Sequence, residues 1–190
     1  MSELESGQQQ EMATLSLPVS TRRDHIQGRP DSPVTLVEYG DYECPYCGQA
    51  YTIIKKIQEG LRGQLRFVFR NFPLNQVHPH AQQAAEAAEA AGAQKKFWNM
   101  HDILYENQQA LDYYHLVEYA SILDLDIERF NNDLFSHTHA SHIREDFISG
   151  VRSGVNGTPT FFINGVRYDG PLDYQSLLEN LLTIEQKLRL

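Results

Sequence analysis

The spacing of hydrophobic and polar positions changes along the chain, and its first part predicts a strand–helix–strand unit. Residues 34–39 are apolar and β-branched, and residues 64–70 alternate polar with apolar side chains, which is typical of strands. Residues 49–61, between them, repeat their apolar positions with helical spacing. Two strands joined by a helix favour a right-handed βαβ unit with a parallel pair of strands.

From about residue 79 to residue 155 the pattern is helical. Residues 80–96 are rich in alanine, and residues 97–105 continue with large apolar side chains at helical spacing. Three further helices are expected over residues 113–123, 127–135 and 141–151. Asp112 and Asp126 are the expected N-caps of the first two.

The strand pattern returns in the last forty or so residues. Asn164-Gly165 is a strong two-residue turn signal within residues 160–168, and Asp173 begins a last amphipathic helix. The predicted order is therefore β-α-β, a block of helices, and β-β-α. The sequence before residue 34 is expected to be irregular, with residues 1–24 forming a polar, disordered N-terminal arm.

The charge balance excludes some partners and suggests a compartment. A net charge of −9 without a basic stripe argues against nucleic acid, and no apolar run is long enough for membrane insertion. The N-terminus carries acidic residues where a signal peptide is positive, and no apolar region follows before Pro18. We therefore expect a cytoplasmic protein, or a periplasmic or extracytoplasmic one if translation starts elsewhere.

The chemistry of the chain centres on Cys44-Pro45-Tyr46-Cys47, which contains its only two cysteines. This segment lies at the predicted strand-to-helix step, with Pro45 in the first turn of the helix. The N–H groups and dipole at a helix N-terminus favour a thiolate, so the pKa of Cys44 is expected below the usual value of about 8.5. Cys47 lies one turn later at disulfide-forming distance. The pair predicts a thiol–disulfide redox centre.

Two other interpretations of the cysteine pair are weaker. A structural disulfide closing so short a loop would constrain the unfolded chain very little. Half of a zinc site would need two more ligands, but there is no second CxxC, and His78 and His80 are too closely spaced for a zinc finger. No metal site is expected. These two histidines, and the three histidines of residues 137–142, are expected to form polar surface.

The order of elements, the cysteine motif and Thr158-Pro159 before the hairpin resemble the thioredoxin fold. The helical block lies where DsbA-like thiol:disulfide oxidoreductases carry an insertion, and the resemblance covers about residues 25–190. It implies an α/β fold with a central mixed sheet. The implied divisions are a first half over residues 25–78, an all-helical insertion over 79–152 and a second half over 153–190.

The same resemblance implies roles for individual residues. Cys44 matches the exposed attacking cysteine, Cys47 the buried resolving cysteine and Pro159 a cis-proline beside the disulfide. Thr158 matches the residue whose backbone pairs with an extended substrate peptide, and Pro45 and Tyr46 are expected at the same substrate surface.

Three acidic residues near the cysteines receive two different interpretations. Glu38, on an otherwise apolar strand, matches a buried carboxylate beneath the active site, with an outward-facing glutamate at the strand end as the alternative. If Glu38 is buried, its pKa should be raised and it could exchange the proton of Cys47. Asp41 and Glu43 are expected to be solvated turn residues.

These residues predict a thiol:disulfide oxidoreductase that acts on protein, peptide or small-molecule disulfides and thiols. No metal or organic cofactor is expected, because the electrons reside on the two sulfur atoms, and an unidentified electron donor or acceptor completes the cycle. Three alternatives remain: a glutathione-dependent, glutaredoxin-like or transferase-like enzyme; a non-catalytic redox-sensing or metal-binding module; and an adaptor domain fused to, or acting on, a membrane protein.

Overall fold

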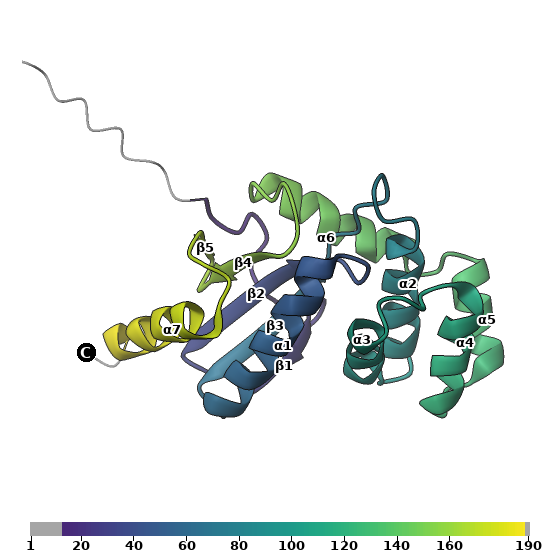
Figure 1. Ribbon diagram of the computed structural model, residues 1–190, viewed down its shortest axis with the longest axis horizontal. Coiled ribbons are helices and arrows are strands. Elements are labelled where there is room, and N and C mark those ends of the chain that lie inside the picture. Colours follow the sequence, from purple (N-terminus) through teal and green to yellow (C-terminus); the bar gives the residue numbers. More distant parts are fainter. Residues whose placement is uncertain (1–12, 189–190) are drawn as a thin grey trace, which may run out of the picture.

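The computed structural model describes residues 13–188, and its elements follow the predicted order with one additional strand at the start (Figure 1). The strands are β1 (His25–Gln27), β2 (Val34–Gly40), β3 (Leu65–Asn71), β4 (Thr160–Ile163) and β5 (Val166–Tyr168). The helices are α1 (Pro45–Gly60), α2 (Ala81–Gly92), α3 (Phe97–Glu106), α4 (Tyr113–Ile122), α5 (Ile127–Phe135), α6 (Ala140–Arg152) and α7 (Tyr174–Leu188).

The strands form one mixed sheet in the order β1-β3-β2-β4-β5. β2 and β3 are parallel, as the βαβ prediction requires, and the other neighbours are antiparallel. The edge strand β1 falls in a region expected to be irregular, and that expectation is wrong there. Three residues are too few to show an alternating pattern, so β1 is recognisable only by its pairing with β3.

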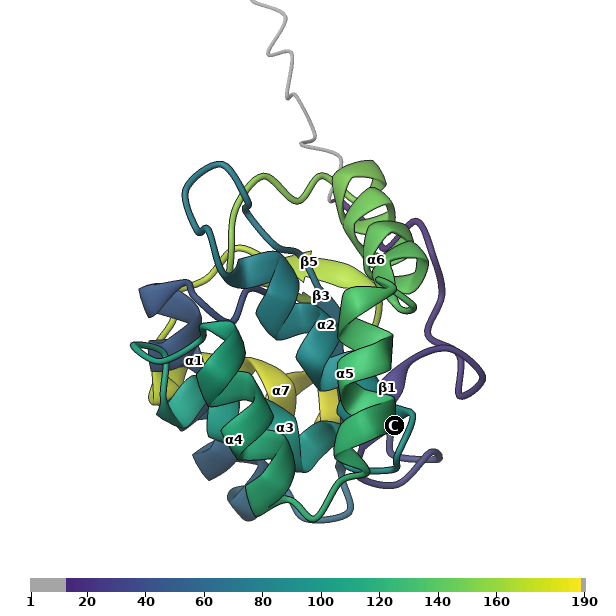
Figure 2. The same cartoon turned by 90° about the vertical axis from the view of Figure 1, so that its right-hand side faces the viewer.

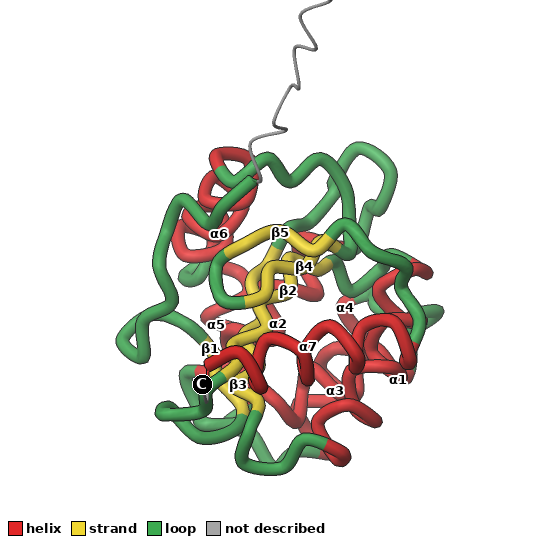
Figure 3. The backbone as a smooth tube through the Cα atoms, turned by 90° about the vertical axis from the view of Figure 1, so that its left-hand side faces the viewer, coloured by secondary structure: helices red, strands yellow, loops and turns green. Residues whose placement is uncertain are grey.

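Helices cover both faces of the sheet, with α1 and α7 on one side and α6 on the other (Figure 3). Alternate residues of the central strands belong to two different buried clusters, one on each face. Val34 and Leu36 pack in the larger core, which also contains the buried sides of α1 and α7. Val37 and Tyr39 face the opposite side, where Phe147 of α6 packs against them. This period of two therefore places even-numbered residues of β2, including Glu38, on the same face of the sheet as α1.

Helices α2–α5 form a block to one side of the sheet (Figure 1), and Figure 2 faces this block. The alanines of α2 are buried and allow close packing, and Asp112 and Asp126 cap α4 and α5 as predicted. The expected helix over residues 80–96 ends early, at residue 92, because Lys95 has a φ of 65° and the chain turns there before α3. Among the helices described, none is long and apolar enough to span a bilayer.

The predicted disordered arm over residues 1–24 is wrong for residues 13–24, whereas residues 1–12 lie outside the described part. The Leu15 N–H donates to the Gly165 carbonyl at 2.9 Å, and the Arg167 N–H donates to the Ala13 carbonyl at 2.9 Å. The side chain of Asp24 is buried and accepts a hydrogen bond from Arg70 Nε at 2.9 Å. Hydrogen bonds to distant residues therefore order a segment whose composition is that of a solvated arm.

Candidate active site

Cys44 is the N-cap residue of α1, directly after the turn that follows β2. Its side chain makes no capping bond, and Pro45 begins the helix. Cys44 is 4% exposed and Cys47 is 0% exposed, and both are free thiols. The expectation of an exposed Cys44 is therefore wrong: its side chain is buried and its sulfur lies 3.4 Å from the Thr158 carbonyl oxygen, whereas the next two residues, Pro45 and Tyr46, are exposed.

The pKa values of the two thiols are shifted in opposite directions. The pKa of Cys44 is lowered to about 5, mainly by the hydrogen bond from Cys47, which outweighs the opposing effect of burial. The Thr158 side chain and the N–H groups at the helix start act in the same direction. Burial raises the pKa of Cys47 well above its usual value, although the Asp41 N–H donates to its sulfur at 3.5 Å. Only Cys44 is therefore a thiolate near neutral pH.

The loop before β4 lies against Cys44. The Thr158–Pro159 peptide bond is cis. In its protonated form, Cys44 Sγ donates to the Thr158 carbonyl at 3.4 Å. The Thr160 hydroxyl donates to the Gly157 carbonyl at 2.8 Å and stabilises the turn. The structure thus brings Thr158 to the sulfur from a loop more than a hundred residues away in sequence.

Glu38 lies inside the protein, on the α1 side of β2, and not at an outward-facing strand end. It is 2% exposed, and within the described residues its Oε1 has no hydrogen-bond partner. Burial, followed by the negative charge of Cys44, raises the pKa of Glu38 to about 8. Its charge also raises the pKa of Cys47, so Glu38 is electrostatically coupled to both sulfurs.

The expectation that Asp41 and Glu43 are solvated turn residues is wrong. Asp41 is 2% exposed and accepts hydrogen bonds from the Glu43 and Leu74 N–H groups, each at 2.8 Å, and pairs with His78 Nδ1 at 2.8 Å. Glu43 accepts a hydrogen bond from the His80 N–H at 2.6 Å and lies 3.0 Å from its Nδ1. Both carboxylates therefore connect the cysteine turn to the loop before α2. His78 and His80 are their partners on that loop.

Sequence reasoning missed two residues of the helical block that reach this site. Gln108 Nε2 donates hydrogen bonds to the Tyr42 carbonyl at 2.8 Å and to the Cys44 carbonyl at 2.9 Å. The Tyr105 hydroxyl is buried without a hydrogen-bond partner among the described residues, within electrostatic reach of Cys47 and Glu38. Neither residue is part of a recognisable sequence motif, because each comes close to the cysteines only when the chain is folded.

The histidines of residues 137–142 do not converge on one point. His137 pairs with Glu86 at 2.9 Å, His139 lies 3.4 Å from Asp133, and His142 lies 3.8 Å from Glu89. The partner atoms belong to three separate carboxylates. This segment is therefore not a metal site by itself.

A family profile described as thioredoxin matches residues 20–182. Among solved structures, oxidised BdbD from Bacillus subtilis is similar with a TM-score of 0.80 and 25% identity, over 92% of this chain and 97% of that one. A thioredoxin-like oxidoreductase from Silicibacter pomeroyi is similar with a TM-score of 0.76 and 26% identity, over 87% and 93% of the two chains. The fold is therefore thioredoxin-like and of the DsbA type, which supports thiol–disulfide exchange.

Curated relatives add a different context. The chain is 44% identical to the Na(+)/H(+) antiporter NhaA 3 of Salinispora tropica over 176 residues, which is 93% of this chain and 27% of that protein. It is 48% identical to the Na(+)/H(+) antiporter NhaA 1 of Salinispora arenicola over 163 residues, covering 86% of this chain and 25% of that protein. The chain thus spans about a quarter of the length of these relatives.

Proposed function

The chain belongs to the thioredoxin family, and from that premise we propose that it is a thiol:disulfide oxidoreductase using Cys44 and Cys47. The observation that carries the proposal is the contrast between the two thiols. Cys44 has a pKa lowered to about 5, and its partner Cys47 has a pKa raised well above the usual value. An acidic sulfur that attacks or leaves and a buried sulfur that resolves are the two parts that exchange requires.

In the oxidising direction, the cycle begins with a Cys44–Cys47 disulfide. A substrate thiolate attacks the Cys44 sulfur, the bond between the cysteines breaks, and Cys47 departs with the electron pair. Glu38, whose pKa of about 8 keeps it mostly protonated at neutral pH, supplies the proton that Cys47 takes up. A second substrate thiolate then attacks the substrate sulfur, which forms the substrate disulfide and releases Cys44 as a thiolate.

The low pKa of Cys44 favours this direction over reduction. A thiolate of low pKa leaves readily, and its stability favours the reduced protein and hence a more oxidising disulfide. The value of about 5 lies between those of thioredoxin, about 7, and DsbA, about 3.5. Each turnover leaves a dithiol, so a second disulfide-exchanging protein or small disulfide must reoxidise the pair.

We propose that the substrates are proteins with free thiols, bound through an extended segment that contains the reacting cysteine. Thr158 precedes β4 and its carbonyl faces Cys44, so a peptide aligned with this backbone would bring its sulfur to Cys44. Pro45 and Tyr46 lie exposed beside the cysteines, and Tyr46 is 65% exposed. These two side chains would contact the substrate.

The test combines turnover with a reduction potential. We expect the protein to catalyse oxidative refolding of a reduced disulfide protein, and its potential against glutathione to be more oxidising than the thioredoxin value of about −270 mV. Cys44→Ser should abolish turnover, whereas His115→Ala, an exposed change on α4, should not. Equal turnover by the wild type and Cys44→Ser would contradict the proposal.

A second role is favoured by the antiporter relatives. We propose that the chain acts with a sodium–proton antiporter and that its thiol state regulates exchange, because the matched region forms about a quarter of proteins with that name. Sodium-driven proton exchange would be measured in membrane vesicles containing a related antiporter, with oxidised or reduced chain added. A difference in exchange rate between the oxidised and the reduced chain that is lost with Cys44→Ser supports the role. Identical exchange rates with both redox forms oppose it.

A further inference from the structure

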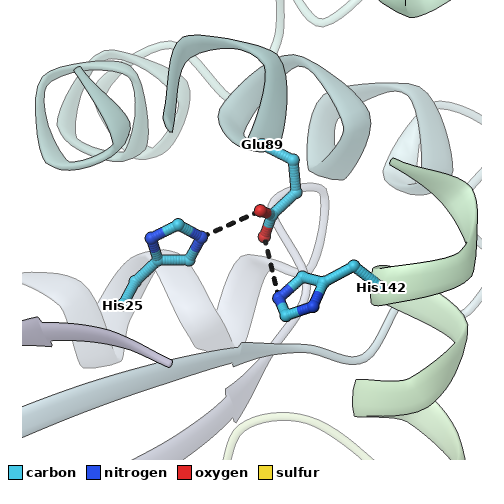
Figure 4. Close-up of side chains that lie close together, drawn as sticks. All are labelled: His25, Glu89 and His142. Carbon is cyan, nitrogen blue, oxygen red and sulfur yellow. Dashed lines mark hydrogen bonds and ion pairs between the residues drawn. The ribbon is translucent and has the colours of Figure 1, made fainter. Parts of the chain in front are cut away.

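We infer that His25, Glu89 and His142 bind a divalent transition metal ion of the zinc class (Figure 4). The three residues come from β1, α2 and α6, and none belongs to the cysteine site. An ion there would join an edge strand of the sheet to the helical block and to the helix covering the opposite face.

The spacing of the ligand atoms suits such an ion. His25 Nε2 lies 2.8 Å from Glu89 Oε2, and His142 Nε2 lies 3.8 Å from Glu89 Oε1. One ligand atom from each residue lies within 4.8 Å of the other two. Zinc binds nitrogen and oxygen at about 2.0–2.2 Å, so ligand atoms of a tetrahedral site are roughly 3.4 Å apart. Small side-chain adjustments would therefore place all three around one ion.

The ligands are already oriented by their surroundings. Asn71 Nδ2 donates to Glu89 Oε1 at 2.8 Å. The His25 ring stacks on Phe97, with ring centroids 3.4 Å apart. Gly92 provides the space for that ring, because a Cβ at position 92 would lie 3.1 Å from His25 Cε1. Hydrogen bonds and packing that fix the ligands before binding are typical of metal sites.

The charges around the cluster also favour a cation. Glu89 is 6% exposed, and its nearest charged partners are the two imidazoles, which are cationic only when protonated. Asp146, 2% exposed, lies within electrostatic reach of His142 and pairs with Arg23 at 2.6 Å. A divalent ion would compensate the buried carboxylate without requiring either histidine to be protonated.

Two histidines and one glutamate are the protein ligands that zinc uses at sites where a water molecule is the fourth ligand. His25 and His142 are each about one quarter exposed, with side-chain values of 24% and 25%, so solvent reaches the cluster. We therefore assign the ligand class as zinc or a similar borderline ion, in preference to calcium or magnesium, which select all-oxygen sites.

The test uses the oxidised protein, because a Cys44–Cys47 disulfide removes the thiolates that would otherwise bind zinc. Zinc is titrated in competition with a chromophoric chelator, and cobalt is used for a ligand-field spectrum of tetrahedral coordination. We expect one ion per chain and at least tenfold weaker binding in His142→Ala and Glu89→Gln. His115→Ala removes an exposed histidine that pairs with Asp112 and should bind as the wild type does.

A thermal melt of each variant provides a second measurement. Zinc should raise the melting temperature of the wild type and of His115→Ala but not that of His142→Ala, because a ligand stabilises only the state that binds it. Circular dichroism without metal checks that each variant is folded, and Glu89→Gln preserves the buried shape if the alanine variant is not folded. Equal zinc affinity in the His142→Ala and His115→Ala variants, or no zinc binding by the oxidised wild type, would overturn the inference.

Discussion

Gln108 lies against Gly48, in the space that any side chain larger than hydrogen at position 48 would occupy. From this position its amide donates to the carbonyls of Tyr42 and Cys44. Gln108 belongs to the loop between α3 and α4, whereas Gly48 is in the first turn of α1. The helical block therefore fixes the turn that carries the reactive sulfur.

Replacing Gly48 with alanine should displace Gln108 and break both hydrogen bonds. We expect Gly48→Ala to lower the free energy of unfolding by about 1–3 kcal/mol, which is typical of overpacking at a tight contact. The cost should shrink in a Gln108→Ala background, where the space is free, and this coupling is measured by a double-mutant cycle in chemical denaturation. Gly60→Ala is the matched control in the same helix, since its Cβ would meet nothing closer than 3.8 Å. Additive costs would contradict the contact.

The acidity of Cys44 should depend on the hydrogen bond from Cys47. The rate of alkylation of reduced protein should rise with a midpoint near pH 5, with Cys44 as the only modified site at neutral pH. Cys47→Ala removes the donor and should raise the midpoint, whereas Cys47→Ser keeps a hydroxyl donor and should raise it less. Mass spectrometry identifies the modified residue. The same midpoint in all three proteins would show that the hydrogen bond does not control the pKa.

The sequence was informative where local pattern and final structure agree. The apolar run of β2, the cysteine motif at the start of α1 and the Asn164-Gly165 turn each depend on neighbouring residues, and the expected elements are present. The caps Asp112 and Asp126 were predictable for the same reason, because capping is a local contact.

The rest of the site required contacts between distant residues. Asp41 is of a residue type that is common in turns, but in the folded protein it is buried and hydrogen-bonded to Leu74 and His78. The sequence around residue 41 does not indicate either hydrogen bond. Gln108 is one polar residue in a loop until folding places it against Gly48. The His25–Glu89–His142 cluster draws on three elements far apart in sequence, so no ligand spacing revealed it.

Asp41 should be important for the stability of the cysteine turn. Asp41→Ala would leave the N–H groups of Glu43 and Leu74 without their acceptor, and each unsatisfied buried donor costs about 1–3 kcal/mol. We therefore expect a loss of more than about 2 kcal/mol in the free energy of unfolding. Asp31→Ala, at an exposed pair with Arg29, should cost less than about 1 kcal/mol. Similar costs for the two variants would show that Asp41 is as solvated as its sequence suggested.

The buried carboxyl of Glu38 should make stability depend on pH in a defined direction. Its pKa is about 8 in the folded protein against an ordinary value of 4.5, so between these values the folded state retains a proton that the unfolded state has lost. Stability from this group is therefore full below pH 4.5, falls as the pH rises and levels off above pH 8. At about 1.4 kcal/mol per pKa unit, the total change amounts to several kcal/mol.

Glu38→Gln removes this titration while keeping the size of the side chain. Cys44 contributes the opposite slope, because its pKa is lowered on folding, so the quantity to measure is the difference between the variant and the wild type at each pH. In chemical denaturation of the reduced proteins, that difference should shift steadily in favour of Glu38→Gln from pH 4.5 to pH 8. Glu118→Gln, on the exposed side of α4, should give a small and constant difference. A constant difference for Glu38→Gln as well would mean that the Glu38 carboxyl is ionised in the folded protein, and would remove it as the proton source for Cys47.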